Sequence, residues 1–70
     1  MHNLLGMKVR DVVKLLETDG WRLVSTAGSH RQFTHPTKKG RVTVAGNMGK
    51  DVPVGTLKSI FRQAGLTEKE

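Results

Sequence analysis

Two apolar stripes with helical spacing stand near the two ends of this 70-residue chain and enclose a block of alternating residues. The stripes consist of Val9, Val12, Val13 and Leu16 and of Leu57, Ile60, Phe61 and Ala64. Each follows the i, i+3, i+4, i+7 pattern of a helix that buries one face. We therefore predict amphipathic helices over residues 8–19 and 53–64. Gly20 and Gly65 suit the ends of these helices, and Pro53 suits a first helical position.

The block between the stripes alternates in three segments, which predict strands over residues 21–27, 30–35 and 41–45. Short polar connections make an antiparallel meander the simplest arrangement. The predicted fold class is α+β with the order α-β-β-β-α, in which two helices lie on one face of a three-stranded antiparallel sheet. In the first strand we expect Trp21, Leu23 and Ser25 on one face and Arg22, Val24 and Thr26 on the other. The open face would carry His30, Gln32, Thr34, Arg22, Thr26 and Thr43.

A chain of this size forms one domain, which we expect over residues 7–66, with a flexible extension at 1–6 and a frayed end at 67–70. There is no cysteine, so disulfides and thiolate metal sites are excluded, as is typical of a cytosolic protein. No apolar run approaches the roughly 20 residues of a membrane helix, and no signal peptide is recognisable. We expect a cytoplasmic protein without membrane contact.

Positive charge dominates the sequence. Twelve lysines and arginines stand against six acidic residues, for a formal net charge of +6. This imbalance indicates a polyanionic partner, most commonly nucleic acid, although net charge also serves solubility. The candidate RNA-binding residues are Arg31, Lys38, Lys39, Arg41 and Lys50. For these side chains, phosphate contacts and simple solvation are both consistent with the sequence.

His30 is the candidate catalytic residue. Gly28 can adopt a positive φ, so Gly28 and Ser29 suit a tight turn between the first two strands. If Phe33 points into the core, alternation places His30 on the open face. An exposed imidazole can take or give a proton near neutral pH, as acid/base chemistry requires. The alternative is an ordinary surface histidine in a turn.

Other catalytic arrangements fit the sequence less well. His30 and His35 are five positions apart in one strand and would face opposite ways, so no metal site is expected. Ser29 lacks the base and acid of a nucleophilic triad. The glycines and lysine of residues 46–50 are followed by Asp51, so this segment is no phosphate-binding P-loop. The three aromatic residues, Trp21, Phe33 and Phe61, occupy core positions more readily than base-stacking ones.

Several short motifs occur together in a fixed order. They are Gly28-Ser29-His30 followed by Phe33, then Gly49-Lys50-Asp51-Val52-Pro53, Gly55-Thr56-Leu57-Lys58-Ser59-Ile60 and Gln63-Ala64-Gly65-Leu66. Over residues 7–66 this set resembles the HicA family of mRNA-cleaving toxins. The resemblance implies a double-stranded-RNA-binding-like fold and cleavage of mRNA without a metal or other cofactor. It also implies a catalytic histidine at His30, supported by the turn at Gly28 and Ser29, and a HicB-like antitoxin as protein partner.

Two other functions remain open from the sequence. A non-catalytic RNA-binding module could use the turn at residues 28–30 as a groove contact. Such modules usually open their second helix with a lysine cluster, and residues 52–57 contain no lysine. A pure interaction protein is the other alternative, and it overlaps with a toxin because a toxin must be bound by an inhibitor.

Overall fold

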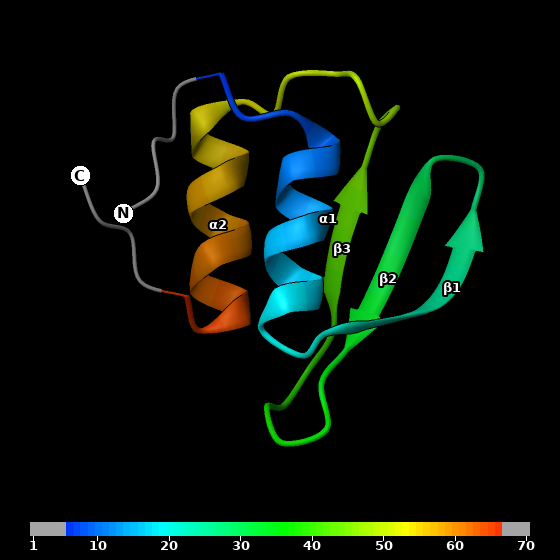
Figure 1. The fold of residues 1–70 in the computed structure, drawn as a ribbon, viewed down its shortest axis with the longest axis vertical. Coiled ribbons are helices and arrows are strands. Elements are labelled where there is room, and N and C mark those ends of the chain that lie inside the picture. The colour runs from blue at the N-terminus through cyan, green and yellow to red at the C-terminus, as the bar shows by residue number, and fades with distance from the viewer. Residues whose placement is uncertain (1–5, 67–70) are drawn as a thin grey trace.

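The computed structural model describes residues 6–66, in which two helices cover one face of a three-stranded sheet (Figure 1). The elements in chain order are α1 (Val9–Thr18), β1 (Arg22–Ala27), β2 (His30–Thr34), β3 (Val42–Ala45) and α2 (Val54–Ala64). The predicted α+β class and α-β-β-β-α order are confirmed. The loose ends predicted at 1–6 and 67–70 fall, apart from Gly6, outside the described residues and stay predictions.

The sheet is an antiparallel meander with β2 in its centre. Its inner face and both helices form a single core, into which every residue of the two predicted stripes is packed. Trp21, Phe33 and Phe61 are each at most 1% exposed. The aromatic side chains are therefore core residues, as predicted, and none of the three presents a ring on which a nucleobase could stack.

The prediction that β1 has one buried face is wrong. All six residues of β1 are exposed, because the helices pack over β3 and β1 lies beyond the edge of this layer (Figure 1). Even Leu23, which pairs with the buried Phe33, is 49% exposed. Distance from the helical layer, and not the alternation of side chains, decides exposure in this strand.

A β-bulge also reverses the faces that were predicted for the second half of β1. The register shifts between Leu23 and Ser25, with Val24 as the extra residue. Beyond the bulge Ser25 pairs with Gln32, and Thr26 pairs with Arg31. Directly paired residues share a face, so Ser25 lies on the open face and Thr26 on the helix-facing side. This is the opposite of the predicted assignment for both residues.

The loop between β3 and α2 caps the start of α1. Lys8 is the N-cap residue and provides no side-chain cap. Instead the N–H groups of Val9 and Arg10 donate to the carbonyls of Lys50 (2.9 Å) and Met48 (3.0 Å). These N–H groups, which have no partner inside a helix, are thus satisfied by a segment about 40 positions away in the sequence. They are not available to a bound phosphate.

Helix α2 begins one residue later than predicted. Pro53 is the N-cap of α2 and not its first residue, with an extended ψ of 143°. Gly65 ends α2 with a left-handed φ of 68°, as predicted. A proline ring constrains only φ, so the sequence alone does not decide between these adjacent positions.

His35 fastens the opposite end of the fold. Its Nδ1 accepts the backbone N–H groups of Thr37 and Lys38, both at 3.1 Å. The ring proton must then be on Nε2, which donates to the carbonyl of Asp19 at 2.7 Å. The ring also packs edge-on against Trp21, with centroids 5.2 Å apart. This histidine is a structural residue that joins the end of α1 to the β2–β3 connection.

Lys38 joins this end of α1 and the β2–β3 connection to α2 as well. Its ammonium donates to the Asp19 carboxylate at 2.6 Å and to the Ala64 carbonyl at 2.9 Å. The Lys38 hydrogen bond lowers the pKa of Asp19 below its usual value, although partial burial opposes the shift. The positive charge of Lys38 also lowers the pKa of Asp19. The indole N–H of Trp21 is buried without a hydrogen-bond partner within residues 6–66.

Candidate active site

His30 is the first residue of the central strand and is exposed on the open face of the sheet. Its cross-strand neighbours are Ala27 on β1 and Ala45 on β3. In antiparallel pairs these side chains share the face of His30, and each contributes only a methyl group. The imidazole is therefore the largest side chain of its row and has open space on both sides. Sequence alternation predicted the face, but the two small neighbours depend on strand register.

A two-residue turn holds His30 at the end of the sheet. Gly28 has a φ of 59°, while Ser29 has no positive φ, the combination found in type II′ hairpin turns. The Ser29 carbonyl accepts the Gly46 N–H at 3.2 Å. The turn is thus joined to the end of β3 as well as to its own two strands. Gly28 and Ser29 thus form the tight turn that the sequence predicted, and this turn leads directly into His30.

Arg31 also joins the β1–β2 turn to the end of β3. As the partner of the buried Val44 it lies on the helix-facing side of the sheet. Its Nη1 donates to the carbonyl of Gly46 at 2.7 Å and to that of Ser29 at 3.2 Å. Arg31 was predicted as an RNA-binding residue, and that role stays untested. The structure assigns its guanidinium a definite second task, which is to hold the turn beside His30.

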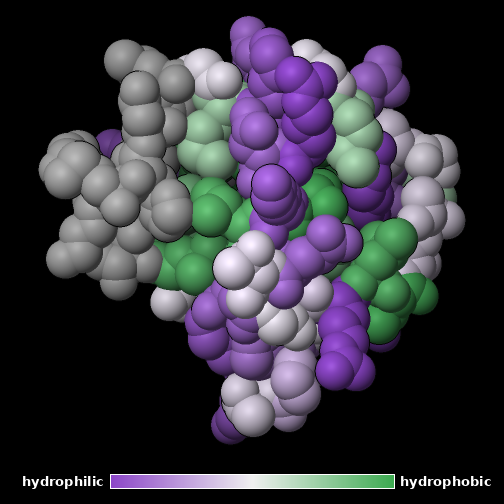
Figure 2. Space-filling model, viewed as in Figure 1, coloured by the Kyte–Doolittle hydropathy of each residue, from purple (hydrophilic) through white to green (hydrophobic). Residues whose placement is uncertain are grey.

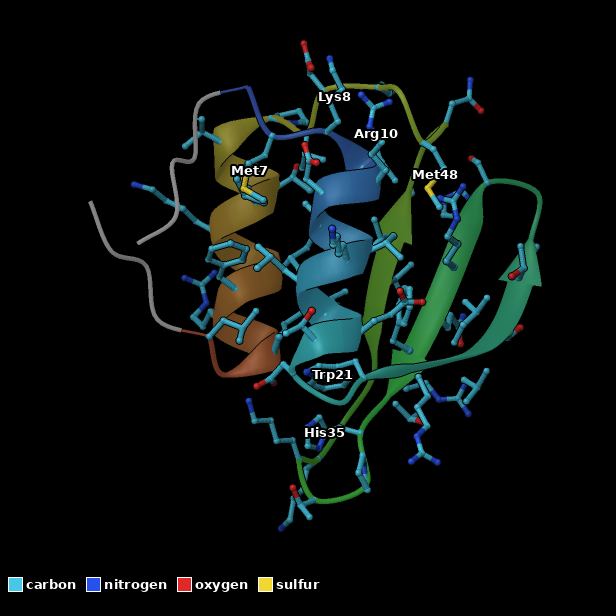
Figure 3. The ribbon with its side chains drawn as sticks, in the orientation of Figure 1. Met7, Lys8, Arg10, Trp21, His35 and Met48 are labelled. Atoms are coloured by element: carbon cyan, nitrogen blue, oxygen red, sulfur yellow. The ribbon has the colours of Figure 1, made fainter. Side chains whose placement is uncertain are left out.

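Two further cations lie near the His30 end of the sheet. The Lys50 side chain is exposed and packs over Gly46, with its Cδ 3.2 Å from the position that a Cβ on Gly46 would occupy. Arg10, on the first turn of α1, is exposed beside Gly49. Figure 3 shows Arg10 and Met48 at the end of the molecule opposite Trp21 and His35. Arg10 is not among the predicted RNA-binding residues, because nothing local in the sequence relates it to His30.

The remaining predicted RNA-binding residues belong to the connection between β2 and β3. Lys38 is held by Asp19 and Ala64, whereas Lys39 is exposed. Arg41 precedes β3 and is four residues from Ala45, the partner of His30, which corresponds to roughly 13 Å of strand. The five predicted cations are therefore divided between the two ends of the sheet.

Arg41 nevertheless reaches back over the open face. It donates to Oε1 of Gln32 at 2.6 Å, and Gln32 is two residues along β2 from His30. His30, Gln32 and Arg41 thus form a polar row on this face. Such a row offers an imidazole, an amide and a cation to one extended polar ligand.

His30 and His35 lie apart, in agreement with the prediction from alternation that they face opposite ways. Within residues 6–66 no three histidine or acidic side chains gather as metal ligands would. At the α1 end, Lys8 binds the exposed Asp51 at 2.8 Å, and this hydrogen bond lowers the pKa of the Asp51 carboxyl. The Lys8 charge is thus partly neutralised, while no described acidic group binds Lys50.

A comparison with known families adds the identity of this fold and site. Residues 9–66 match the family described as the HicA toxin of bacterial toxin-antitoxin systems. The chain belongs to the HicA toxin family. Its role is accordingly that of a toxin, and a toxin of this kind has an antitoxin partner. No curated protein matched the chain. Neither helix in the described part of the chain has the length and apolar character needed to cross a membrane.

Proposed function

We propose that this HicA-family toxin is an endoribonuclease that cleaves mRNA, with His30 as the general base. The position of His30 carries the proposal: an exposed imidazole stands between two alanines on the open face of the central strand. A polynucleotide backbone can approach such a ring from either side. The net charge of +6 supports a polyanionic substrate, and the toxin role supports a destructive reaction.

RNA carries its own nucleophile beside each phosphate. His30 accepts the proton of a ribose 2′-hydroxyl while the 2′-oxygen attacks the adjacent phosphorus. The bond from phosphorus to the 5′-oxygen breaks, and this oxygen leaves with a proton from solvent or a general acid. The products are a 2′,3′-cyclic phosphate and a 5′-hydroxyl. The reaction balances without a cofactor, and it requires the 2′-hydroxyl at the cleaved position.

Lys50 is the cation best placed to stabilise the charge that develops on the phosphate. It lies over Gly46, whose N–H binds the turn beside His30, and it has no acidic partner among the described residues. Lys38 is occupied by Asp19 and Ala64 at the far end of the sheet. We assign Arg41, which donates to Gln32, and the exposed Lys39 to binding RNA farther from His30.

We further propose that the protein acts in the cytoplasm, where mRNA is translated, and that a HicB-like antitoxin inhibits it. The antitoxin would prevent cleavage by covering the exposed face that carries His30. An inhibitor of complementary charge needs no conformational change in the toxin to exclude a polyanion.

The test uses purified toxin and two oligonucleotides of identical sequence, one with a 2′-deoxy sugar at the cleaved position. We expect cleavage of the RNA, a cyclic phosphate product and no cleavage at the deoxy position. His30→Ala is expected to lower the rate at least a hundredfold.

His35→Ala is the matched control, since it removes the second described histidine without touching the open face. It should lower thermal stability, whereas His30→Ala should leave the melting temperature within about 2 °C of the parent. Undiminished cleavage by a folded His30→Ala protein would disprove the general-base assignment. Tight, salt-dependent binding to duplex RNA without any cleavage would instead identify a non-catalytic RNA-binding module.

A further inference from the structure

Strand β1 leaves one edge of the sheet without cover. Its six residues are all exposed, and the helices pack over β3 on the other side of the sheet (Figure 1). Leu23 and Val24 are 49% and 51% exposed, which is high for large apolar side chains. Figure 2 shows an apolar patch at the right-hand side of the molecule, where Figure 1 places β1. This edge combines exposed apolar groups with exposed backbone.

The register shows which backbone groups of β1 point outward. The Gly46 N–H donates to the Ser29 carbonyl. Ser29 precedes His30 and Gly46 follows Ala45, so this bond identifies His30 and Ala45 as a non-hydrogen-bonded pair. The backbone groups of His30 therefore turn the other way, toward Ala27. His30 and Ala27 therefore form a hydrogen-bonded pair. Because pair types alternate along an antiparallel ladder, the next pair between β1 and β2, Thr26 with Arg31, is not hydrogen-bonded. The N–H and C=O of Thr26 consequently point away from the sheet.

Few of the usual protections are present on this edge. Strands at sheet edges are commonly guarded by lysine, proline or a covering loop. Residues 22–27 contain neither lysine nor proline, and the bulge at Val24 disturbs only the first half of the strand. Residues 25–27 keep a regular register with β2. Free backbone groups beside apolar side chains are the features used in recognition by β-strand addition.

We propose that the outer edge of β1 binds an extended, acidic segment of the antitoxin as a fourth strand. A second copy of this chain would be the other obvious occupant, but self-pairing joins two surfaces of the same chain, each part of a molecule with a net charge of +6. An acidic partner gains from that charge and also covers Leu23 and Val24. The inference rests on the toxin role and its antitoxin, and it does not depend on the cleavage reaction.

Binding at this edge also explains how one contact can inhibit the toxin. Strands in a sheet are about 4.8 Å apart, so an added strand lies roughly 10 Å from β2. Ala27, at the end of β1, is the direct neighbour of His30. A folded domain continuing from the added strand would stand over the turn at residues 28–29 and over the open face. Substrate would then be excluded by occupancy.

The decisive variant is Thr26→Pro, which removes one outward N–H without removing a bond between β1 and β2. The matched control is Thr26→Val, which keeps the N–H and the branched shape. The probe is the purified HicB-like antitoxin, and binding is measured by calorimetry in the absence of RNA. We expect Thr26→Pro to weaken binding at least tenfold and Thr26→Val to change it less than threefold. Equal affinity of a folded Thr26→Pro protein and the parent would overturn the proposal.

A second measurement needs no variant. Amide hydrogen exchange of the parent toxin should show a fast-exchanging Thr26 N–H when the toxin is free and at least tenfold slower exchange in the complex. An unchanged Thr26 amide in the saturated complex would contradict the proposal. So would a parent dimer in sedimentation that Thr26→Pro abolishes, since a second copy would then be the occupant. Failure of RNA cleavage leaves all these readouts unaffected, so the two proposals can fail separately.

Discussion

The guanidinium of Arg31 donates to the carbonyl of Gly46 at 2.7 Å, and so connects the residue after His30 with the residue after β3. The same Nη1 donates to Ser29, within the turn that precedes His30. A planar guanidinium can hold two carbonyl groups in fixed directions, which a lysine ammonium on a flexible chain does less well. The orientation of the candidate base thus depends on a side chain from the opposite face of the sheet.

Arg31→Ala is expected to lower the free energy of unfolding by about 2 kcal/mol, because two part-buried carbonyls lose a charged donor. For a domain of this size the melting temperature should fall by about 10 °C. Arg31→Lys should recover part of the stability but not the full cleavage rate. Urea unfolding followed by circular dichroism measures the first effect, and single-turnover cleavage measures the second.

Arg22→Ala serves as the comparison for Arg31. Arg22 is an exposed arginine on the neighbouring strand, where its backbone pairs with Thr34, and its side chain makes no hydrogen bond or ion pair within residues 6–66. Its removal should change stability by no more than about 0.5 kcal/mol. Similar losses for the two variants would show that the bonds of Arg31 contribute nothing specific.

Gly20→Ala should be much more destabilising than Gly40→Ala. Both glycines have a positive φ, 103° and 81°, so both substitutions strain the backbone by about 1 to 2 kcal/mol. Only at Gly20 would the new Cβ meet another atom, Nε2 of His35, at 2.9 Å. This contact would displace the ring from its bond to Asp19. We expect the Gly20 variant to lose about 2 kcal/mol more than the Gly40 variant in urea unfolding.

The stability of the fold should fall in acid partly through Asp19. Its pKa in the folded protein is below the ordinary value of 3.8, chiefly because Lys38 donates a hydrogen bond to its carboxylate. The contribution is therefore complete above the pKa of the unfolded chain and is lost as pH falls through the lower, folded pKa. Lys38→Met should reduce stability by about 1 kcal/mol at neutral pH and flatten the decline between about pH 5 and 2.

Lys39→Met is the control for this pH dependence, because Lys39 is exposed and has no acidic partner in the described chain. Its stability should follow the parent at every pH. If Lys38→Met and the parent lost stability in parallel as the pH fell, Asp19 would have no part in the acid sensitivity. Unfolding free energies at intervals of one pH unit provide the comparison.

Lys50→Gln is expected to lower the rate of RNA cleavage about tenfold to a hundredfold, through loss of charge stabilisation near His30. Its backbone carbonyl still accepts the Val9 N–H, so the fold should not change. Lys58→Gln removes the same charge from the exposed surface of α2 and should reduce cleavage less than threefold. Equal effects of the two substitutions would indicate that net charge, and not position, determines activity.

Local patterns were sufficient for the order of the elements. The apolar stripe from Val9 to Leu16 and the glycine after each helix depend on the helical repeat and on backbone sterics, which act within a few residues. The face of His30 followed from Phe33, three positions away on the same strand. The positions of His30 and of its turn were accessible to sequence reasoning for that reason.

Other features were decided by contacts between distant segments. The bulge at Val24 moved Thr26 to the helix-facing side, and the position of the helices over β3 left Leu23 exposed. Lys38 was one cation of a basic run in the sequence, yet Asp19 and Ala64 bind it at the far end of the sheet. Alternation along one strand carries no information on strand register or on which distant carbonyl a long side chain can reach. Those depend on how the layers pack together, and only the tertiary structure determines that packing.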